Sequence, residues 1–135
     1  MPDNRPGDRR KVVFVIEDEP AIGELIASAI SDEPGYSAVL ITEPTKALET
    51  TKQLAPDVMV VDVRLPGMSG FELYDRLKSD PRTRSVPVLF ETANGLENIA
   101  EFRKRGIATY VEKPFDLFDI VGFVKRLASG SAAAA

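Results

Sequence analysis

Carboxylates and a lysine stand directly after three short apolar runs of this sequence. Glu17 and Asp18 follow the first run, Asp62 follows the third, and Lys113 follows the fifth. Carboxylate oxygens suit hard divalent cations, and few protein ligands with several waters favour Mg²⁺ over Ca²⁺. A carboxylate beside Mg²⁺ and a lysine can attack phosphorus and form an aspartyl phosphate. The pattern therefore predicts phosphoryl chemistry at Asp62.

Electrostatics supports a cation among these groups. Two carboxylates about 4 Å apart repel by roughly 4 kcal/mol at an effective dielectric constant near 20. Three in one crevice would raise one another's pKa unless positive charge were present, and Lys113 supplies only one such charge. Thr92, which follows the fourth apolar run, adds a hydroxyl that can bond a phosphoryl oxygen.

Composition excludes several other chemistries. The 135 residues contain no cysteine and no histidine, so disulfides, histidine bases and typical zinc or copper sites are excluded. A formal net charge of −4 argues against broad nucleic-acid binding. No apolar run is long enough for a signal peptide or a membrane span, so we expect a cytoplasmic protein without membrane contact.

Five apolar runs alternate with five segments of helical spacing. The alternation predicts a parallel sheet covered by helices on both faces, and five units are too few for an eight-stranded barrel. In such doubly wound α/β sheets, active groups gather beyond the carboxyl ends of the strands. The predicted strands are 12–16, 38–41, 58–61, 87–90 and 108–111, and the helical patterns cover 22–30, 47–55, 71–77, 96–103 and 117–127.

Four segments of the chain match one protein family. They are Val-Ile-Glu-Asp-Glu-Pro at 15–20, Val-Val-Asp-Val-Arg-Leu-Pro-Gly-Met-Ser-Gly at 60–70, Val-Pro-Val-Leu-Phe-Glu-Thr-Ala at 86–93 and Tyr-Val-Glu-Lys-Pro-Phe at 110–115. All four occur in this order, each at the end of a predicted strand. The chain thus resembles the response-regulator receiver domains of two-component signalling over about residues 11–128.

The resemblance implies a role for each matching residue. Asp62 is the implied phosphoacceptor and also an implied ligand of Mg²⁺. Glu17 stands where many members have aspartate, and we expect its longer side chain still to reach the ion. The remaining implied roles are metal ligation by Asp18 and by the backbone carbonyl of Arg64, phosphoryl sensing by Thr92 and Lys113, switching by the Tyr110 ring, and a cis peptide bond before Pro114.

The resemblance also implies an architecture and partners. The expected fold is a flavodoxin-like (βα)5 domain with strand order 2-1-3-4-5, spanning residues 11–128 between a flexible lead (1–10) and a flexible tail (129–135). No output domain follows, so we expect a single-domain regulator, a relay intermediate or an excised domain. The implied partners are a histidine kinase or histidine phosphotransfer protein and an unknown target. A homodimer through the face of the fourth helix, fifth strand and fifth helix is a further candidate, which an exposed Phe102, Phe118 or Phe123 would favour.

Other functions remain open at this point. A Mg²⁺-dependent phosphatase of the dehalogenase type wants a second aspartate two residues after the nucleophile, where this chain has Arg64. An FMN binder needs a phosphate-cradling loop after the first strand, where acidic residues would repel the phosphate. A docking module that works without phosphorylation needs none of the site residues. We expect a regulatory domain that assists only its own phosphoryl transfer and autodephosphorylation, and not an enzyme.

Overall fold

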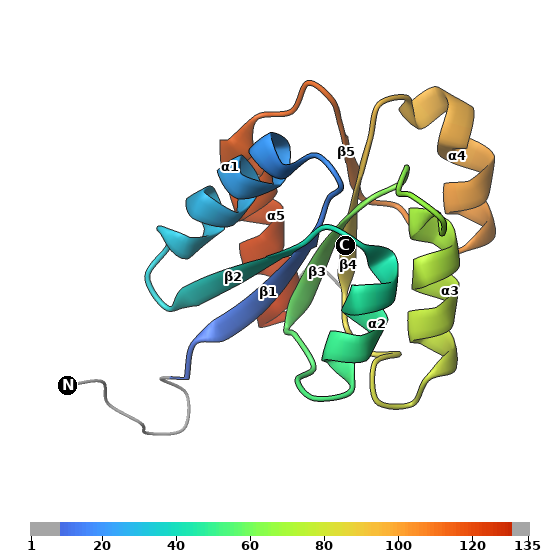
Figure 1. Ribbon diagram of the computed structural model, residues 1–135. Coiled ribbons are helices and arrows are strands. Elements are labelled where there is room, and N and C mark those ends of the chain that lie inside the picture. The colour runs from blue at the N-terminus through green and yellow to red at the C-terminus, as the bar shows by residue number, and fades with distance from the viewer. Residues whose placement is uncertain (1–8, 131–135) are drawn as a thin grey trace.

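The computed structural model describes residues 9–130, and it confirms the predicted alternation of strands and helices (Figure 1). Most of the predicted lead and tail, residues 1–8 and 131–135, lies outside the described residues. The ten elements follow one another in the order β1 (Lys11–Ile16), α1 (Pro20–Ser31), β2 (Tyr36–Ile41), α2 (Pro44–Thr51), β3 (Val58–Asp62), α3 (Gly70–Ser79), β4 (Val88–Thr92), α4 (Gly95–Lys104), β5 (Tyr110–Glu112) and α5 (Leu117–Ser129).

The five strands form one parallel sheet in the order β2-β1-β3-β4-β5, as expected. Helices α1 and α5 cover one face, and α2, α3 and α4 cover the other, as Figure 1 shows. The three interior strands, β1, β3 and β4, are mostly apolar on both sides because each face of the sheet is buried under helices. β3 illustrates this, since all five of its residues are buried.

Two hydrophobic cores follow from the alternation of side chains along the strands. Phe14 and Phe90 point to the α2–α3–α4 face and pack with Phe71 and Phe102 from the helices. Val60 points to the opposite face of the sheet. There Val13, Val15, Val60 and Leu89 of the strands pack against Ile26 and Ile30 of α1 and Ile120 and Val124 of α5. Each core fixes the direction of the strands that carry the site.

Some element boundaries differ from the sequence prediction. α2 ends at Thr51, several residues before Pro56, and Leu54 is 48% exposed and not part of a helical stripe. The apolar spacing over 96–103 locates α4 correctly but not its buried face, because Leu96 is 81% exposed and the helix buries Phe102. β5 begins at Tyr110, two residues later than predicted.

Helix starts near the carboxyl edge of the sheet use two kinds of signal. Pro20 and Pro44 occupy the first turns of α1 and α2, where a missing N–H costs nothing. Ser69 and Asn94 cap α3 and α4 through side-chain oxygens that accept from Glu72 N and Glu97 N. None of the helices that the structure describes is long and apolar enough to cross a bilayer.

Candidate metal and phosphoryl site

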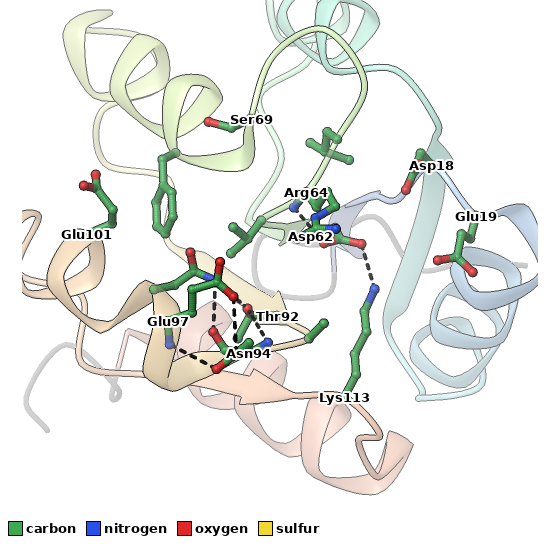
Figure 2. Close-up of a pocket in the computed structure, with 15 residues that line it drawn as sticks. Asp18, Glu19, Asp62, Arg64, Ser69, Thr92, Asn94, Glu97, Glu101 and Lys113 are labelled. Carbon is green, nitrogen blue, oxygen red and sulfur yellow. Dashed lines mark hydrogen bonds and ion pairs between the residues drawn. The ribbon is translucent and has the colours of Figure 1, made fainter.

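The carboxyl edge of the sheet gathers the charged residues that follow separate strands. Asp62 ends β3, Glu17 comes directly after β1, and Lys113 comes directly after β5. The Nζ atom of Lys113 lies 2.8 Å from Oδ2 of Asp62 and 3.8 Å from Oε1 of Glu17. Figure 2 shows the Lys113 side chain extending across the opening to Asp62. The sequence prediction that these groups meet at one edge is therefore right in geometry.

A cleft of about 540 Å³ opens over these residues. Its walls come from the loops after β1, β3, β4 and β5, and from the first turns of α3 and α4 (Figure 2). Asp62 lies at its floor and is only 4% exposed. The residues lining it include Asp18, Arg64, Ser69, Thr92, Asn94, Glu97, Asn98 and Lys113. The cleft is therefore open enough for a small anion to approach Asp62.

Asp62 is held by donors on both of its oxygens. Oδ1 accepts a hydrogen bond of 2.9 Å from Arg64 N, and Oδ2 accepts one of 2.8 Å from Lys113. Gly70 is needed beside it, because a Cβ there would collide with the Asp62 carbonyl oxygen. The turn from β3 into α3 thus fixes both the backbone and the carboxylate of Asp62.

Three carboxylates are close enough to hold a cation. Oxygens of Glu17, Asp18 and Asp62 all lie within 4.8 Å of one another. Oε1 of Glu17 is buried and accepts no hydrogen bond from the residues that the structure describes. An all-oxygen donor set with an unpartnered buried atom fits a hard divalent cation. The residues present therefore fit Mg²⁺, and Asp18, which is exposed, leaves room for waters around the ion.

Burial sets the protonation of the carboxylates in the absence of an ion. Burial, with Glu91 and Asp62 nearby, raises the pKa of Glu17 to about 9. Burial likewise raises the pKa of Glu91 to about 7, against the opposing effects of the neighbouring Glu17 carboxyl and of Lys113. Burial lowers the pKa of Lys113, but its hydrogen bond to Asp62 and the surrounding carboxylates outweigh this, and its pKa lies above the ordinary value. A divalent cation here would favour the ionised carboxylates.

Thr92 lies at the end of β4, beside the cleft. Its Oγ1 atom accepts hydrogen bonds from Asn94 N at 3.1 Å and from Asn98 Nδ2 at 2.9 Å. The hydroxyl is thereby tied to the first turn of α4, and Figure 2 shows Thr92 and Asn94 on the side of the cleft opposite Asp18. Asn98 had no signal in the sequence, because an asparagine as the fourth residue of a helix is ordinary.

Tyr110 lies away from Asp62 and packs beneath α4. Its ring stacks on Phe102 with centroids 4.3 Å apart and an angle of 9° between the planes. A Cβ on Gly95, the first residue of α4, would collide with the Tyr110 ring. A displacement of the start of α4 would therefore change the packing of the Tyr110 ring. The Lys113–Pro114 peptide bond is cis, the geometry that the resemblance led us to expect.

Glu91 is a fourth carboxylate that the sequence analysis did not assign. It is paired in register with Asp62, is fully buried, and has Oε1 3.7 Å from Nζ of Lys113. A signal was present, because Glu91 directly follows the apolar run at 87–90, as Glu17 follows the run at 12–16. Thr92, one residue further along, ends the strand, and the expectation from the sequence falls on Thr92.

Fold and site together define a class of protein: a doubly wound α/β domain with a cluster of three carboxylates at the carboxyl edge of its sheet. The family model described as "Response regulator receiver domain" matches residues 13–125. The chain belongs to this family, which is regulatory and acts in two-component systems. The resemblance seen in the four sequence segments is thereby confirmed.

Relatives of the chain include whole signalling proteins. It is 33% identical over 119 residues to hybrid signal transduction histidine kinase D of Dictyostelium discoideum, covering 87% of this chain and 8% of that protein. It is 34% identical over 118 residues to the phosphate regulon transcriptional regulatory protein PhoB of Pseudomonas aeruginosa, covering 87% of this chain and 51% of the regulator. The chain thus spans about half the length of that regulator and a small part of the kinase.

A solved structure shares the fold. The receiver domain of a sensor histidine kinase from Pseudomonas aeruginosa, solved with a magnesium ion coordinated in its active site cleft, superposes with a TM-score of 0.76. The match covers 89% of this chain and 98% of that domain at 23% identity. The flavodoxin-like fold with strand order 2-1-3-4-5 is therefore confirmed.

Proposed function

We propose that this chain is a phosphorylatable switch that accepts a phosphoryl group on Asp62 from a histidine kinase or histidine phosphotransfer protein in a cytoplasmic phosphorelay. The observation that carries the proposal is the position of Asp62, at the floor of the cleft and hydrogen-bonded to Lys113 at 2.8 Å. The family of the chain supports the same reading. No turnover on an external substrate is part of the proposal.

The chain's own residues account for the transfer. An oxygen of Asp62 forms a bond to phosphorus while the bond from phosphorus to the donor's imidazole nitrogen breaks. Arg64 N and Lys113 hold the carboxylate, so the nucleophile enters the reaction already oriented. Lys113 then offsets negative charge on the phosphoryl oxygens. The Thr92 hydroxyl only accepts hydrogen bonds from Asn94 and Asn98, so its own hydrogen can be donated to a phosphoryl oxygen.

Mg²⁺ would be held by Glu17, Asp18, Asp62 and the backbone carbonyl of Arg64. The close approach of the three carboxylates supports this ligand set, and the magnesium in the receiver domain of the Pseudomonas kinase gives a precedent in the same fold. When bound, the ion supplies positive charge that neutralises the carboxylates and the incoming phosphoryl oxygens. Neither Thr92 nor Lys113 is needed to hold it.

Incubation with acetyl phosphate and Mg²⁺ tests the proposed function. We expect intact-protein mass spectrometry to show the gain of one phosphoryl group, and chelation of the metal to prevent it. Acid-labile and base-labile modification is the expected signature of an acyl phosphate. A chain that stays unmodified while inorganic phosphate accumulates catalytically would instead indicate a phosphatase, and a chain that shows neither result would indicate a docking module.

Replacing Asp18 tests the ligand set. We expect Asp18→Ala to weaken Mg²⁺ binding roughly tenfold or more, because the loss of one ligating group has effects of at least this order. The exposed Glu24 on α1 offers the matched control, and Glu24→Ala should bind Mg²⁺ like the parent chain. Calorimetric titration of both variants gives the comparison. Unchanged affinity in Asp18→Ala would place the ion elsewhere.

Replacing Lys113 tests the coupling of the site to α4 and β5. With Mg²⁺ and beryllofluoride, a mimic of the phosphoryl group, we expect amide NMR shifts over residues 92–113 in the parent chain. Lys113→Ala should still show Mg²⁺-induced shifts near Asp18, but most of the shifts over 92–113 should disappear because the link from β5 to Asp62 is gone. The exposed Lys52 provides a control substitution. Full shifts in Lys113→Ala would remove this lysine from the switch.

The surface for a downstream partner stays a prediction. Phe102 is buried and Phe123 is half-buried, whereas Phe118 at the start of α5 is 82% exposed. Leu96 at the start of α4 is 81% exposed. These two side chains favour the proposed use of the α4–β5–α5 face for an output protein or a second copy of the chain, and the switch at Tyr110 would act on the same face.

A further inference from the structure

Glu91 is a charged residue inside the buried strand β4. Its side chain has no exposed surface, and neither carboxylate oxygen accepts a hydrogen bond from the residues that the structure describes. Burying a carboxylate without a partner is costly, and such groups are normally paired. Leu or Val would fill the same position without that cost. The position of Glu91 therefore calls for an explanation beyond packing.

The strand register places Glu91 in the row of site residues. Asp62 is its direct neighbour on β3, and both side chains point to the same face as Val60 and Leu89. The cation facing it is Lys113, directly after β5, with Nζ 3.7 Å from Oε1 of Glu91, and the Glu17 carboxyl also lies beside it. Among the residues that the structure describes, no other lysine or arginine forms an ion pair with Glu91.

One ammonium group is thus shared by three carboxylates. Lys113 Nζ lies 2.8 Å from Asp62, 3.7 Å from Glu91 and 3.8 Å from Glu17. An ammonium has three donors on a flexible stem, so a movement of about 1 Å exchanges one hydrogen-bonding partner for another. Glu91 is fully buried within β4, so Lys113 lies between its hydrogen-bonding acceptor Asp62 and a second buried carboxylate.

We propose that Glu91 is a positioning residue for Lys113, which offers the lysine a second acceptor and so withholds it from a phosphoryl group on Asp62. The inference rests on the proposed function of Asp62. Phosphorylation turns one carboxylate oxygen into the bridging oxygen of an acyl phosphate, which is a weak acceptor. The phosphoryl oxygens and Glu91 then compete for the Lys113 ammonium. Glu91 therefore acts as a brake, because it disfavours the state in which Lys113 binds the phosphoryl group.

Beryllofluoride binding at saturating Mg²⁺ tests the brake. Glu91→Gln, which keeps the shape and removes the charge, should bind beryllofluoride more tightly, roughly three- to tenfold, within the range for groups in one network. Glu91→Met should give the same direction. Glu19→Gln removes a charge from the exposed rim of the cleft without contact to Lys113, and it should change the affinity less than twofold.

The same titration in a Lys113→Ala background separates positioning from simple charge repulsion. If Glu91 acts through the lysine, Glu91→Gln gives no further gain once Lys113 is absent. A gain that persists in that background, or equal affinities for Glu91→Gln and the parent chain, overturns the proposal. A parent chain that shows no beryllofluoride response contradicts the proposed function of Asp62 instead.

A second arm needs no phosphoryl mimic. In metal-free buffer, Lys113→Ala should lower the melting temperature of the parent chain more than it lowers that of Glu91→Gln, because Glu91 loses its cation only in the former. Equal decreases in melting temperature in the two backgrounds would show that Glu91 and Lys113 do not stabilise each other. That result would overturn the proposal even if phosphoryl uptake were established.

Discussion

Asp62→Asn should abolish the mass gain that acetyl phosphate and Mg²⁺ produce in the parent chain. Asparagine keeps the size of the side chain but offers an amide, which is a poor nucleophile and cannot form an acyl phosphate. No other carboxylate lies at the floor of the cleft with a hydrogen bond to Lys113 among the residues that the structure describes. The expected effect is therefore complete loss and not a reduced rate.

The matched control for this substitution is Asp32→Asn. Asp32 is exposed after the end of α1, and its replacement should leave the uptake unchanged. Both variants should have cooperative urea transitions, so that a loss of uptake cannot be assigned to unfolding. Persistent uptake in Asp62→Asn would assign the phosphoryl group to another residue.

Metal-free protein should become less stable as the pH rises from 5 to 8. Burial raises the pKa of Glu17 to about 9 and that of Glu91 to about 7 in the folded chain, whereas both carboxyls titrate near 4.5 when unfolded. The folded state then binds more protons than the unfolded state between these values, and the free energy of unfolding falls with pH. Stability from these groups is fully present below pH 4.5 and is lost as the pH approaches the folded values.

For Glu91 alone, the shift corresponds to a loss of about 3 kcal/mol across this window. Asp75 and Asp80 have pKa values below their ordinary range and therefore titrate outside it. Urea unfolding at pH 5, 6, 7 and 8 in the presence of a chelator measures the effect. Glu91→Gln should make the loss of stability smaller, and the remaining loss should come from Glu17. Saturating Mg²⁺ should restore stability at pH 8. A stability that stays level or increases toward pH 8 without metal would contradict the assignment of buried, destabilised carboxylates.

The architecture could be predicted from the sequence because several signals agree. Continuous apolar runs such as 58–61 indicate strands buried on both faces, and Pro20 and Pro44 mark helix starts. The rule that active groups lie beyond the carboxyl ends of parallel strands then joined Asp62 and Lys113, which are 51 positions apart. The structure places them 2.8 Å apart.

The failures have local physical causes. Leu54 and Ala55 continue the apolar pattern up to Pro56, but α2 ends at Thr51, and the exposed Leu54 gains no burial that would extend the helix. In α4, apolar spacing pointed to Leu96, whereas burial of Phe102 against Phe71, Phe90 and Tyr110 decides which face turns inward. Tertiary packing overrides periodicity in short helices.

The site was predicted in part for a similar reason. Residues after strand ends are visible in the sequence as charges following apolar runs, and Glu17, Asp18 and Lys113 were found in this way. Glu91 is the second-to-last residue of β4 and pairs with Asp62 of β3. Only the register of the two strands reveals this contact. The hydrogen bond from Asn98 to Thr92 likewise depends on where α4 begins, which the sequence leaves open.

A crystal structure with Mg²⁺ and beryllofluoride tests the central claim most directly. We expect beryllium bonded to an oxygen of Asp62, with the ion beside Glu17 and Asp18 and the Lys113 ammonium on a fluorine. An ion bound away from these carboxylates, or a mimic that sits on any other residue, would contradict the assignment of this cleft as the phosphoryl site.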